Sequence, residues 1–148
     1  RLLVAKGKML IFSEPMRYGI TSPRHNFALF PHRITMMDPV DGGVFVGTKA
    51  GVDFLAGNTP KEWALRKTGG RPPVPYASCG MSTGELSADM TANVGNGQGA
   101  VWLSDNGFVV GLPSGNVIES QRTRIRGLSG ETGAIAVVNR RLRATVGG

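Results

Sequence analysis

VWLSDNGFVVGLP, residues 101–113, consists of an apolar run, a short polar turn and a second apolar run. Runs of this length that are rich in Val, Phe and Trp and bounded by Gly, Asn or Asp are typical of β-strands. The pair Asn106-Gly107 favours a type I′ turn, in which both central residues take positive φ. The stretch therefore predicts an antiparallel β-hairpin.

The same pattern occurs four times along the chain. The copies are LLVAKGKMLIFS (Leu2–Ser13), VFVGTKAGVDFLAG (Val44–Gly57), VWLSDNGFVVGLP (Val101–Pro113) and AIAVVNRRLRATV (Ala134–Val146). Since a single hairpin is marginally stable in water, four copies indicate sheets that bury each other's faces. The bulky members of the paired runs are the expected core: Phe12, Val46, Phe54, Trp102, Leu103 and Val109.

The spacing of the hairpins favours a propeller-like fold. Counted from Leu3, Val44, Val101 and Ile135, the hairpins are 41, 57 and 34 residues apart. The blades of a β-propeller, with four antiparallel strands each, repeat every ~40–50 residues. The last copy ends near Gly148, without two further strands. We therefore expect an all-β fold of antiparallel hairpin repeats, a partial β-propeller of about three to four blades, in one domain over residues 1–148.

Weaker patterns lie between the hairpins. Strands are expected at His32–Val40 and, as an exposed edge, at Asn116–Arg124. Trp63–Lys67 alternates like a strand, but the preceding Thr59-Pro60-Lys61-Glu62 is a capping box that would also allow a short helical turn. The Gly- and Pro-rich segment 69–99 is expected to be a long loop or insertion, with a short strand near Glu85–Thr91 as an alternative.

The composition indicates a folded, basic chain with few charges. Glycine accounts for 22 of 148 residues, about twice its usual share of ~7%. Charged residues make up 18%, below the usual ~25%, which suggests a surface partly covered by neighbours. The net charge of +7 permits contact with nucleic acid or an acidic partner without requiring it.

The cysteine count and the hydropathy indicate in which cellular compartment the chain is made. Cys79 is the only cysteine, so no internal disulfide is possible and an ordinary thiol made in a reducing cytoplasm is expected. No apolar stretch approaches the ~18 residues of a membrane span, and we expect no signal peptide. Because the sequence opens with Arg1 directly on an apolar run, we expect it to be part of a larger chain.

No residue pattern predicts catalysis, and we expect no enzyme. His25 and His32 have no further ligand at metal spacing, so neither a metal nor a cofactor is expected. The acidic residues are dispersed; Asp38 and Asp53 could converge as in a glycosidase, but turn and edge positions explain them better. The sequence has no nucleophile elbow and no phosphate-binding loop followed by a helix.

Arginine clusters in the last third of the chain. Six arginines lie there, and three of them, Arg122, Arg124 and Arg126, fall at alternating positions. On a strand these three would share one face. They could contact a charged neighbouring subunit, or form a solvated strand face whose charges prevent edge-to-edge aggregation. They could also bind nucleic acid, but no aromatic residues lie between them on which single-stranded bases would stack. The candidate interface residues are Arg122, Arg124, Arg126, Arg140, Arg141 and Arg143.

Two groups of residues resemble virion proteins of tailed bacteriophages. The first is KMLIFSEPMRYG, Lys8–Gly19. The second is a set of strand-and-turn patterns similar to successive blades of the same proteins: GVFVGT at Gly43–Thr48, GVDFLAG at Gly51–Gly57, and AVWLS at Ala100–Ser104 with Gly107, Gly111-Leu112-Pro113 and Gly115-Asn116-Val117 after it. These phage proteins include β-propeller-bearing tail components, among them the tail nozzle, of the tail tubular protein B type.

The resemblance covers most of the chain and implies a structural role in a phage tail. It implies a homo-oligomeric ring around the DNA exit channel that contacts other virion proteins and lets DNA pass without reading its sequence. It implies no catalytic residues, and a virion location after synthesis in the host cytoplasm. Two alternatives are a propeller that binds or cleaves host glycans, which would show exposed aromatics and paired acids, and a bacterial protein-interaction module.

Overall fold

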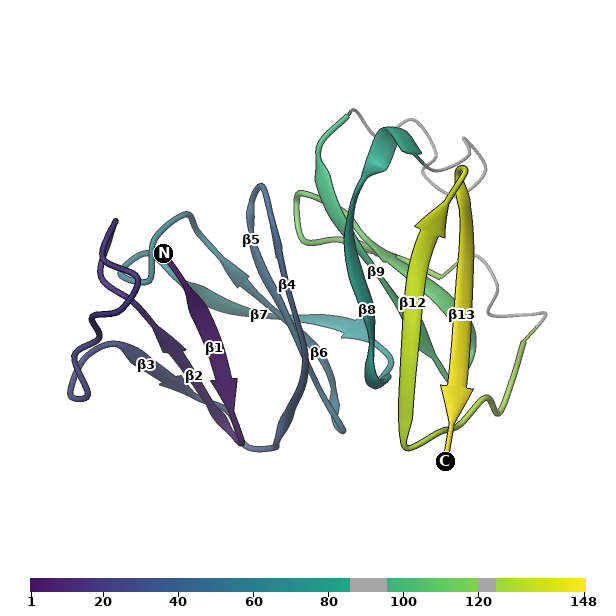
Figure 1. The fold of residues 1–148 in the computed structure, drawn as a ribbon, viewed down its shortest axis with the longest axis horizontal. Coiled ribbons are helices and arrows are strands. Elements are labelled where there is room, and N and C mark those ends of the chain that lie inside the picture. Colours follow the sequence, from purple (N-terminus) through teal and green to yellow (C-terminus); the bar gives the residue numbers. More distant parts are fainter. Residues whose placement is uncertain (86–95, 120–124) are drawn as a thin grey trace. The chain divides into compact units, whose positions relative to one another are not determined.

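The computed structural model describes residues 1–85, 96–119 and 125–148 (Figure 1). The regular elements of these residues are antiparallel β-strands and one short 3-10 helix, η1 (Thr83–Glu85). The prediction of an all-β antiparallel fold is confirmed. Contacts divide the chain into an N-terminal unit, Arg1–Ile34, and a C-terminal unit, Thr35–Gly148, where one domain was expected. The N-terminal strands hydrogen-bond among themselves, and a new sheet begins at the boundary.

The N-terminal unit contains one sheet of three strands. They are adjacent in chain order and antiparallel: β1 (Leu3–Lys6), β2 (Met9–Phe12) and β3 (Phe27–Leu29).

The C-terminal unit contains two four-stranded sheets and one two-stranded hairpin. The first sheet consists of β4 (Ile34–Val40), β5 (Gly43–Thr48), β6 (Gly51–Ala56) and β7 (Ala64–Gly70). The second consists of β8 (Pro73–Ser82), β9 (Gln98–Ser104), β10 (Gly107–Gly111) and β11 (Val117–Ile118). The hairpin pairs β12 (Thr132–Val138) with β13 (Arg141–Gly147). Both four-stranded sheets are ordered as in the chain, the arrangement of one propeller blade; the partial propeller itself stays a prediction.

All four predicted hairpins are present, as the pairs β1–β2, β5–β6, β9–β10 and β12–β13. The strand prediction at His32–Val40 corresponds to β4, and the segment after the capping box forms strand β7 rather than a helix. The edge strand predicted at Asn116–Arg124 has only β11 within the described residues. Residues 86–91 of the alternative strand lie outside them.

The prediction of a loop over 69–99 is wrong for its first part, because β8 occupies Pro73–Ser82. Proline is tolerated at sheet edges and bulges, where no ladder hydrogen bond is lost. β8 is an edge strand of its sheet, its register shifts between Pro73 and Ser78, and Tyr76 takes φ 66° at that irregularity. The Gly and Pro content therefore marked a bulged edge strand.

The turn prediction at residues 104–107 is also wrong. Gly107 has φ 93°, but Asn106 is not among the residues with positive φ, so the turn is not type I′. A negative φ in the turn followed by a left-handed glycine is the pattern of a type I turn with a bulge. The hairpin β12–β13 has the type I′ geometry instead, because Asn139 and Arg140 take φ 50° and 61°.

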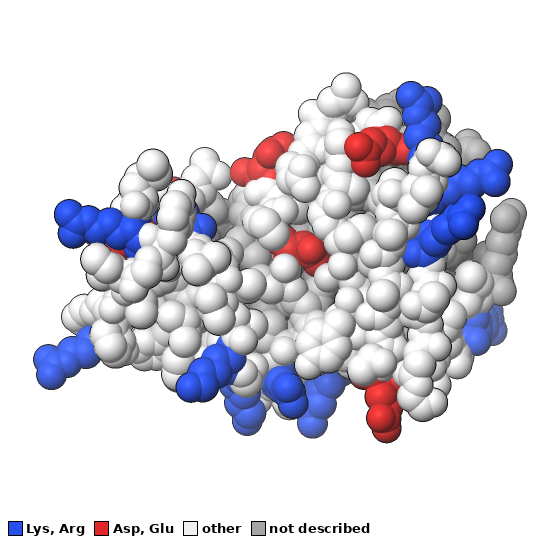
Figure 2. All heavy atoms as spheres, viewed as in Figure 1, with Lys and Arg blue, Asp and Glu red and all other residues white. Residues whose placement is uncertain are grey.

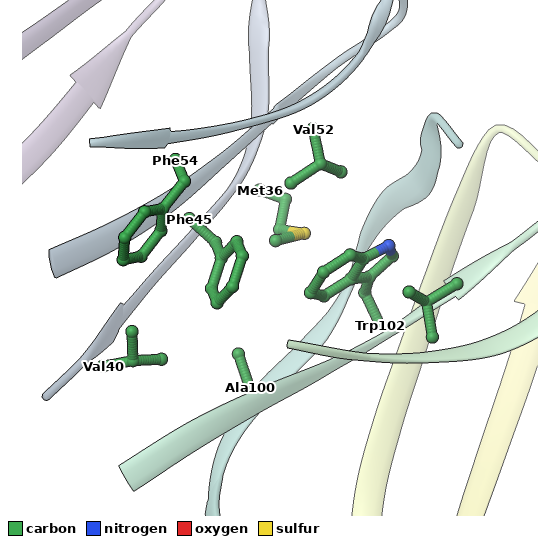
Figure 3. Packing of buried hydrophobic residues seen from close by; sticks show 8 residues of the cluster. Met36, Val40, Phe45, Val52, Phe54, Ala100 and Trp102 are labelled. Carbon is green, nitrogen blue, oxygen red and sulfur yellow. The ribbon is translucent and has the colours of Figure 1, made fainter. Parts of the chain in front are cut away.

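The main core of the C-terminal unit lies between its two four-stranded sheets (Figure 3). Phe45 from β5 and Trp102 from β9 meet there with ring centroids 5.4 Å apart, and Phe54 from β6 lies 4.8 Å from Phe45. Met36, Val40 and Val52 from the first sheet and Ala100 and Val109 from the second complete the cluster. All six predicted core residues are buried: Phe12, Val46, Phe54, Trp102, Leu103 and Val109.

Strand β9 is buried on both faces, which explains why its sequence is a continuous apolar run. Trp102 faces the first sheet, and its neighbours Val101 and Leu103 belong to clusters on the opposite face. The hairpin β12–β13 covers that opposite face with Ile135, Val137, Leu142 and Ala144.

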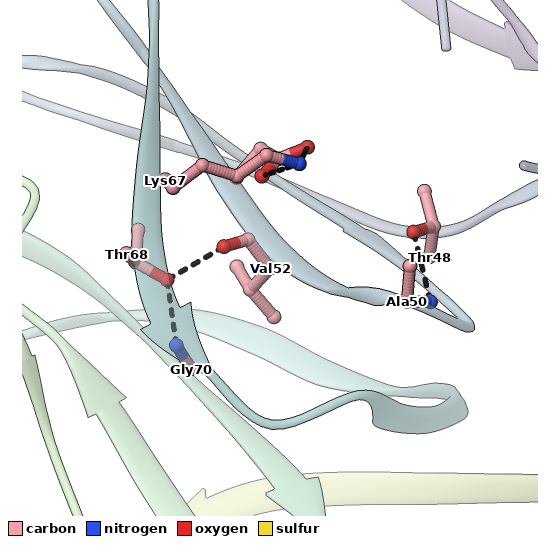
Figure 4. Close-up of polar contacts among 7 residues, drawn as sticks. Thr48, Ala50, Val52, Lys67, Thr68 and Gly70 are labelled. Atoms are coloured by element: carbon pink, nitrogen blue, oxygen red, sulfur yellow. Dashed lines mark hydrogen bonds and ion pairs between the residues drawn. The ribbon is translucent and has the colours of Figure 1, made fainter. Parts of the chain in front are cut away.

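Polar contacts hold the irregular end of the β6–β7 pair (Figure 4). The Thr68 hydroxyl donates to the Val52 carbonyl over 2.6 Å and accepts from the Gly70 amide over 3.0 Å, where the register shifts. The Lys67 ammonium lies 3.1 Å from a carboxylate oxygen of the buried Asp53. The two Thr68 hydrogen bonds satisfy backbone groups that the bulge leaves out of the ladder.

Candidate protein-interaction surfaces

The six candidate arginines do not form one cluster in the described residues. Arg122 and Arg124 lie outside those residues. Arg126 is exposed in the segment before β12, and Arg140 is exposed in the turn between β12 and β13. Arg141 and Arg143 remain as a pair on β13.

Arg141 and Arg143 share the outward face of the hairpin β12–β13. Burial alternates from Arg141 to Thr145, so Leu142 and Ala144 point inward while the two arginines and Thr145 are exposed. Figure 2 shows basic side chains gathered around the turn end of this hairpin. Among the described residues, neither arginine has a carboxylate within ion-pair distance; the pairs there are Lys67–Asp53 and Arg71–Asp105.

The outward face of the hairpin is hollow next to Arg143. Arg143 is directly opposite Ala136, and Thr145 is opposite Ala134. Because the β12 residues are small, a shallow hollow of about 230 Å³ opens over the backbone of the Ile135–Ala144 pair. Its lining is almost entirely apolar, so an occupant would contact alanine methyl groups and the Arg143 side chain together.

The N-terminal unit exposes an apolar sheet face that the sequence analysis missed. Val4, Ile11 and Phe27 are aligned across the three strands, and Leu29 beside them is 67% exposed. A hollow of about 90 Å³ lies next to Val4 and Ile11 and is also lined by Tyr18. The signal was available: Leu2–Ala5 and Met9–Phe12 are apolar at every position, and a sheet with two apolar faces needs cover on both.

The loop after β2 presents three more apolar side chains. Met16, Tyr18 and Ile20 are 82%, 56% and 52% exposed, yet the loop is internally bonded. The Glu14 amide donates to the Ile20 carbonyl over 2.9 Å, and the Asn26 side chain donates to the Glu14 carboxylate over 2.6 Å. The loop is therefore a defined protrusion whose tips are apolar.

The two carboxylates considered for a glycosidase pair have separate partners, and neither is at a turn. Asp38 lies buried within β4, and Asp53 lies buried in β6, an inner strand, with Lys67 beside it. The expectation of turn and edge positions is correct for Asp38, because β4 is an edge strand, and wrong for Asp53. Burial raises the pKa of Asp38, and a hydrogen bond with the Ser78 side chain lowers it.

The Cys79 thiol lies close to this carboxyl. Burial raises its pKa, and the negative charges of Asp38 and Glu85 raise it further. A raised pKa keeps a thiol protonated and unreactive, so this cysteine has the character of a structural residue.

Metal and membrane chemistry find no support in residues 1–85, 96–119 and 125–148. No group of three or more His, Cys, Asp or Glu side chains is placed there to hold a metal ion. In the described residues, no helix is long and apolar enough to cross a membrane. The candidate surfaces in the described residues are the apolar face of the N-terminal unit and the arginine-bearing face of the hairpin β12–β13. In comparisons with known proteins, no family model, no curated protein and no solved structure matches this chain.

Proposed function

We propose that this chain is a structural component of a phage tail, of the nozzle or a tail-associated kind, that works through protein–protein contacts around the DNA exit channel. The observation that carries the proposal is the exposed apolar face of the N-terminal unit. Monomeric soluble proteins rarely leave such a face open, and larger exposed patches mark contact sites with other proteins.

The position of the phage-like segment supports the same proposal. Lys8–Gly19, the stretch that resembles tail proteins, contributes β2 to the apolar face and Met16 and Tyr18 to the protruding loop. The residues that carry the resemblance are thus the residues that a neighbouring subunit would contact. A homo-oligomeric ring would follow if the apolar face of one copy meets a different surface of the next, because such contacts close into rings when the rotation permits.

Association of the purified full chain tests the contact role. Sedimentation velocity should show oligomers that dissociate when Val4→Asp and Leu29→Asp place charges on the apolar face. The matched control carries Asn58→Asp and Ser129→Asp, two equal charge changes at exposed sites of the C-terminal unit, and should associate like the original chain. A chain that is monomeric at all concentrations, or a control that dissociates equally, would contradict the contact role.

The location in a virion needs a separate measurement. Mass spectrometry of purified phage particles from a phage that encodes this chain should find it in fixed copy number, with immunogold label at the tail. Detection in the infected-cell lysate but not in particles would reject the tail assignment.

A further inference from the structure

We propose that the outer edge of β13 binds an extended acidic segment of a partner protein, which adds a third strand to the hairpin β12–β13. The proposal rests on the proposed contact function and names the partner chemistry for a second surface, distinct from the apolar face. It is carried by two features of the same strand: an unpaired backbone edge, and two arginines on one face.

The backbone edge comes from the topology of the hairpin. Among the described residues, β13 pairs with β12 alone. The inward face of β12 packs against β8, where a β-carbon at Gly133 would be 2.8 Å from the Ala77 β-carbon. Figure 1 shows β12 between β8 and β13. Within residues 1–85, 96–119 and 125–148, no strand pairs with the outer edge of β13.

The type I′ turn determines which backbone groups this edge presents. In a two-residue hairpin, the residues flanking the turn exchange both hydrogen bonds, so Val138 and Arg141 form such a pair. Bonded and non-bonded pairs then alternate along the ladder. Leu142, Ala144 and Val146 fall at the non-bonded pairs. Their N–H and C=O groups therefore point to the outer edge, ready for a third strand.

The two arginines indicate which side chains the added partner strand would carry. Arg141 and Arg143 are two residues apart on the outward face, and residues directly opposite on neighbouring strands have β-carbons ~4.5–5.5 Å apart. A segment with acidic residues at alternating positions would place one carboxylate beside each guanidinium. Its intervening residues would be apolar and face the same side as Leu142 and Ala144.

An acidic peptide strand fits this surface better than a nucleic acid does. The unpaired N–H and C=O groups match a peptide backbone, and the outward face carries Ala134, Ala136 and Val138 but no aromatic side chain on which bases would stack. Arginine on a free edge also deters edge-to-edge aggregation. An edge that only deters aggregation would have no affinity for an acidic strand. A binding measurement therefore distinguishes this role from the proposed one.

The test uses the full chain and a short end-capped peptide that alternates Glu and Val; a Lys and Val peptide and an oligo-dT serve as competitors. Fluorescence anisotropy should show binding of the Glu peptide that weakens with salt. Hydrogen exchange should slow at the amides of Leu142, Ala144 and Val146, a readout that needs no variant. Arg141→Glu with Arg143→Glu should weaken binding about tenfold or more and confer binding of the Lys peptide.

The matched control reverses two exposed arginines of the N-terminal unit, Arg24→Glu and Arg33→Glu, and should bind the Glu peptide within about twofold of the original chain. Absence of binding, equal loss in this control, protection at amides outside β13, or displacement by oligo-dT would each overturn the proposal. A chain that assembles in virions but ignores the peptide would reject the acidic strand and leave the proposed function standing. Peptide binding by a chain that is absent from particles would support the acidic strand and reject the proposed function.

Discussion

Gly111 makes room for the indole of Trp102: a β-carbon at position 111 would lie 2.7 Å from Trp102 Cζ3, and 2.6 Å from Phe45 Cε2. Both rings belong to the core between the two four-stranded sheets. The glycine therefore allows the second sheet to approach the first closely enough for its tryptophan to reach Phe45. This relationship makes position 111 a sensitive test of how the sheets pack.

Gly111→Ala should destabilise the protein by about 1–3 kcal/mol, because the added methyl overpacks a buried site and forces the two rings apart. Urea unfolding measures the loss. Gly19→Ala is the matched control, since a β-carbon there meets nothing within 4 Å. Adding Phe45→Leu should recover part of the loss, as residues in contact are not additive. Equal midpoints for both alanine variants would contradict the packing.

Trp102→Ala should cost about 3–5 kcal/mol, since it removes the largest fully buried side chain of the described residues. The measurement is again the free energy of unfolding in urea. Trp63→Ala, at a half-buried indole, should cost clearly less. A midpoint that hardly moves for Trp102→Ala would mean that the core does not lie between the sheets.

Arg66→Ala should lower stability by about 1–2 kcal/mol. The Arg66 guanidinium donates to the Ser114 carbonyl over 2.8 Å and lies 5.2 Å from the Phe54 ring centroid. It thus joins β7 to the turn after β10, across the two sheets. Arg66→Lys should recover less than half of the loss, because a lysine lacks the planar group that covers the ring. Equal stability of the alanine variant and the original chain would show that the contact contributes nothing.

The hairpins could be predicted because each apolar run and its turn are local in sequence. Phe54 and Trp102 are buried as expected, and Phe45, which the core prediction did not include, is buried between them because β5 is buried at every position. β8 could not be predicted in the same way, because Pro73 and Pro75 disfavour a strand until its position at a bulged edge is known. The prediction of the turn type was wrong for a similar reason. Asn106-Gly107 permits a type I′ turn or a type I turn with a bulge, and the pairing of Gly107 with Ser104 decides between them.

The candidate surfaces were predicted less well than the fold. The shared strand face was predicted for Arg122, Arg124 and Arg126, but the first two lie outside the described residues and Arg126 is not on a strand. Arg141 and Arg143, which do share one face of β13, were predicted only as members of the last hairpin. The apolar face around Val4 and Leu29 was missed, because apolar runs were assigned to the core without asking what covers the second face of a three-stranded sheet. Cover by a neighbour is a property of an assembly, and the local pattern of one chain does not encode it.

Asp38 should make the stability of the protein depend on pH. Its side chain is 8% exposed, one carboxylate oxygen has no hydrogen-bond partner in the described residues, and burial raises its pKa above the ordinary value of 3.8. A carboxyl whose pKa is higher in the folded state binds its proton more tightly there, so protonation stabilises the fold. That contribution is complete below the ordinary pKa and is lost as the pH rises through the folded value.

The comparison of the original chain with Asp38→Asn isolates this effect. The free energy of unfolding of the original chain, minus that of the variant, should fall as the pH rises from about 3 to about 8, because only the original chain ionises at this position. Ser78→Ala should extend the fall to higher pH, since it removes the hydrogen bond that lowers the pKa of Asp38. NMR titration of the Asp38 carboxyl gives the folded value directly. A difference that stays constant with pH, or rises with it, would show that Asp38 is hydrated and that β4 does not bury its carboxyl against β8.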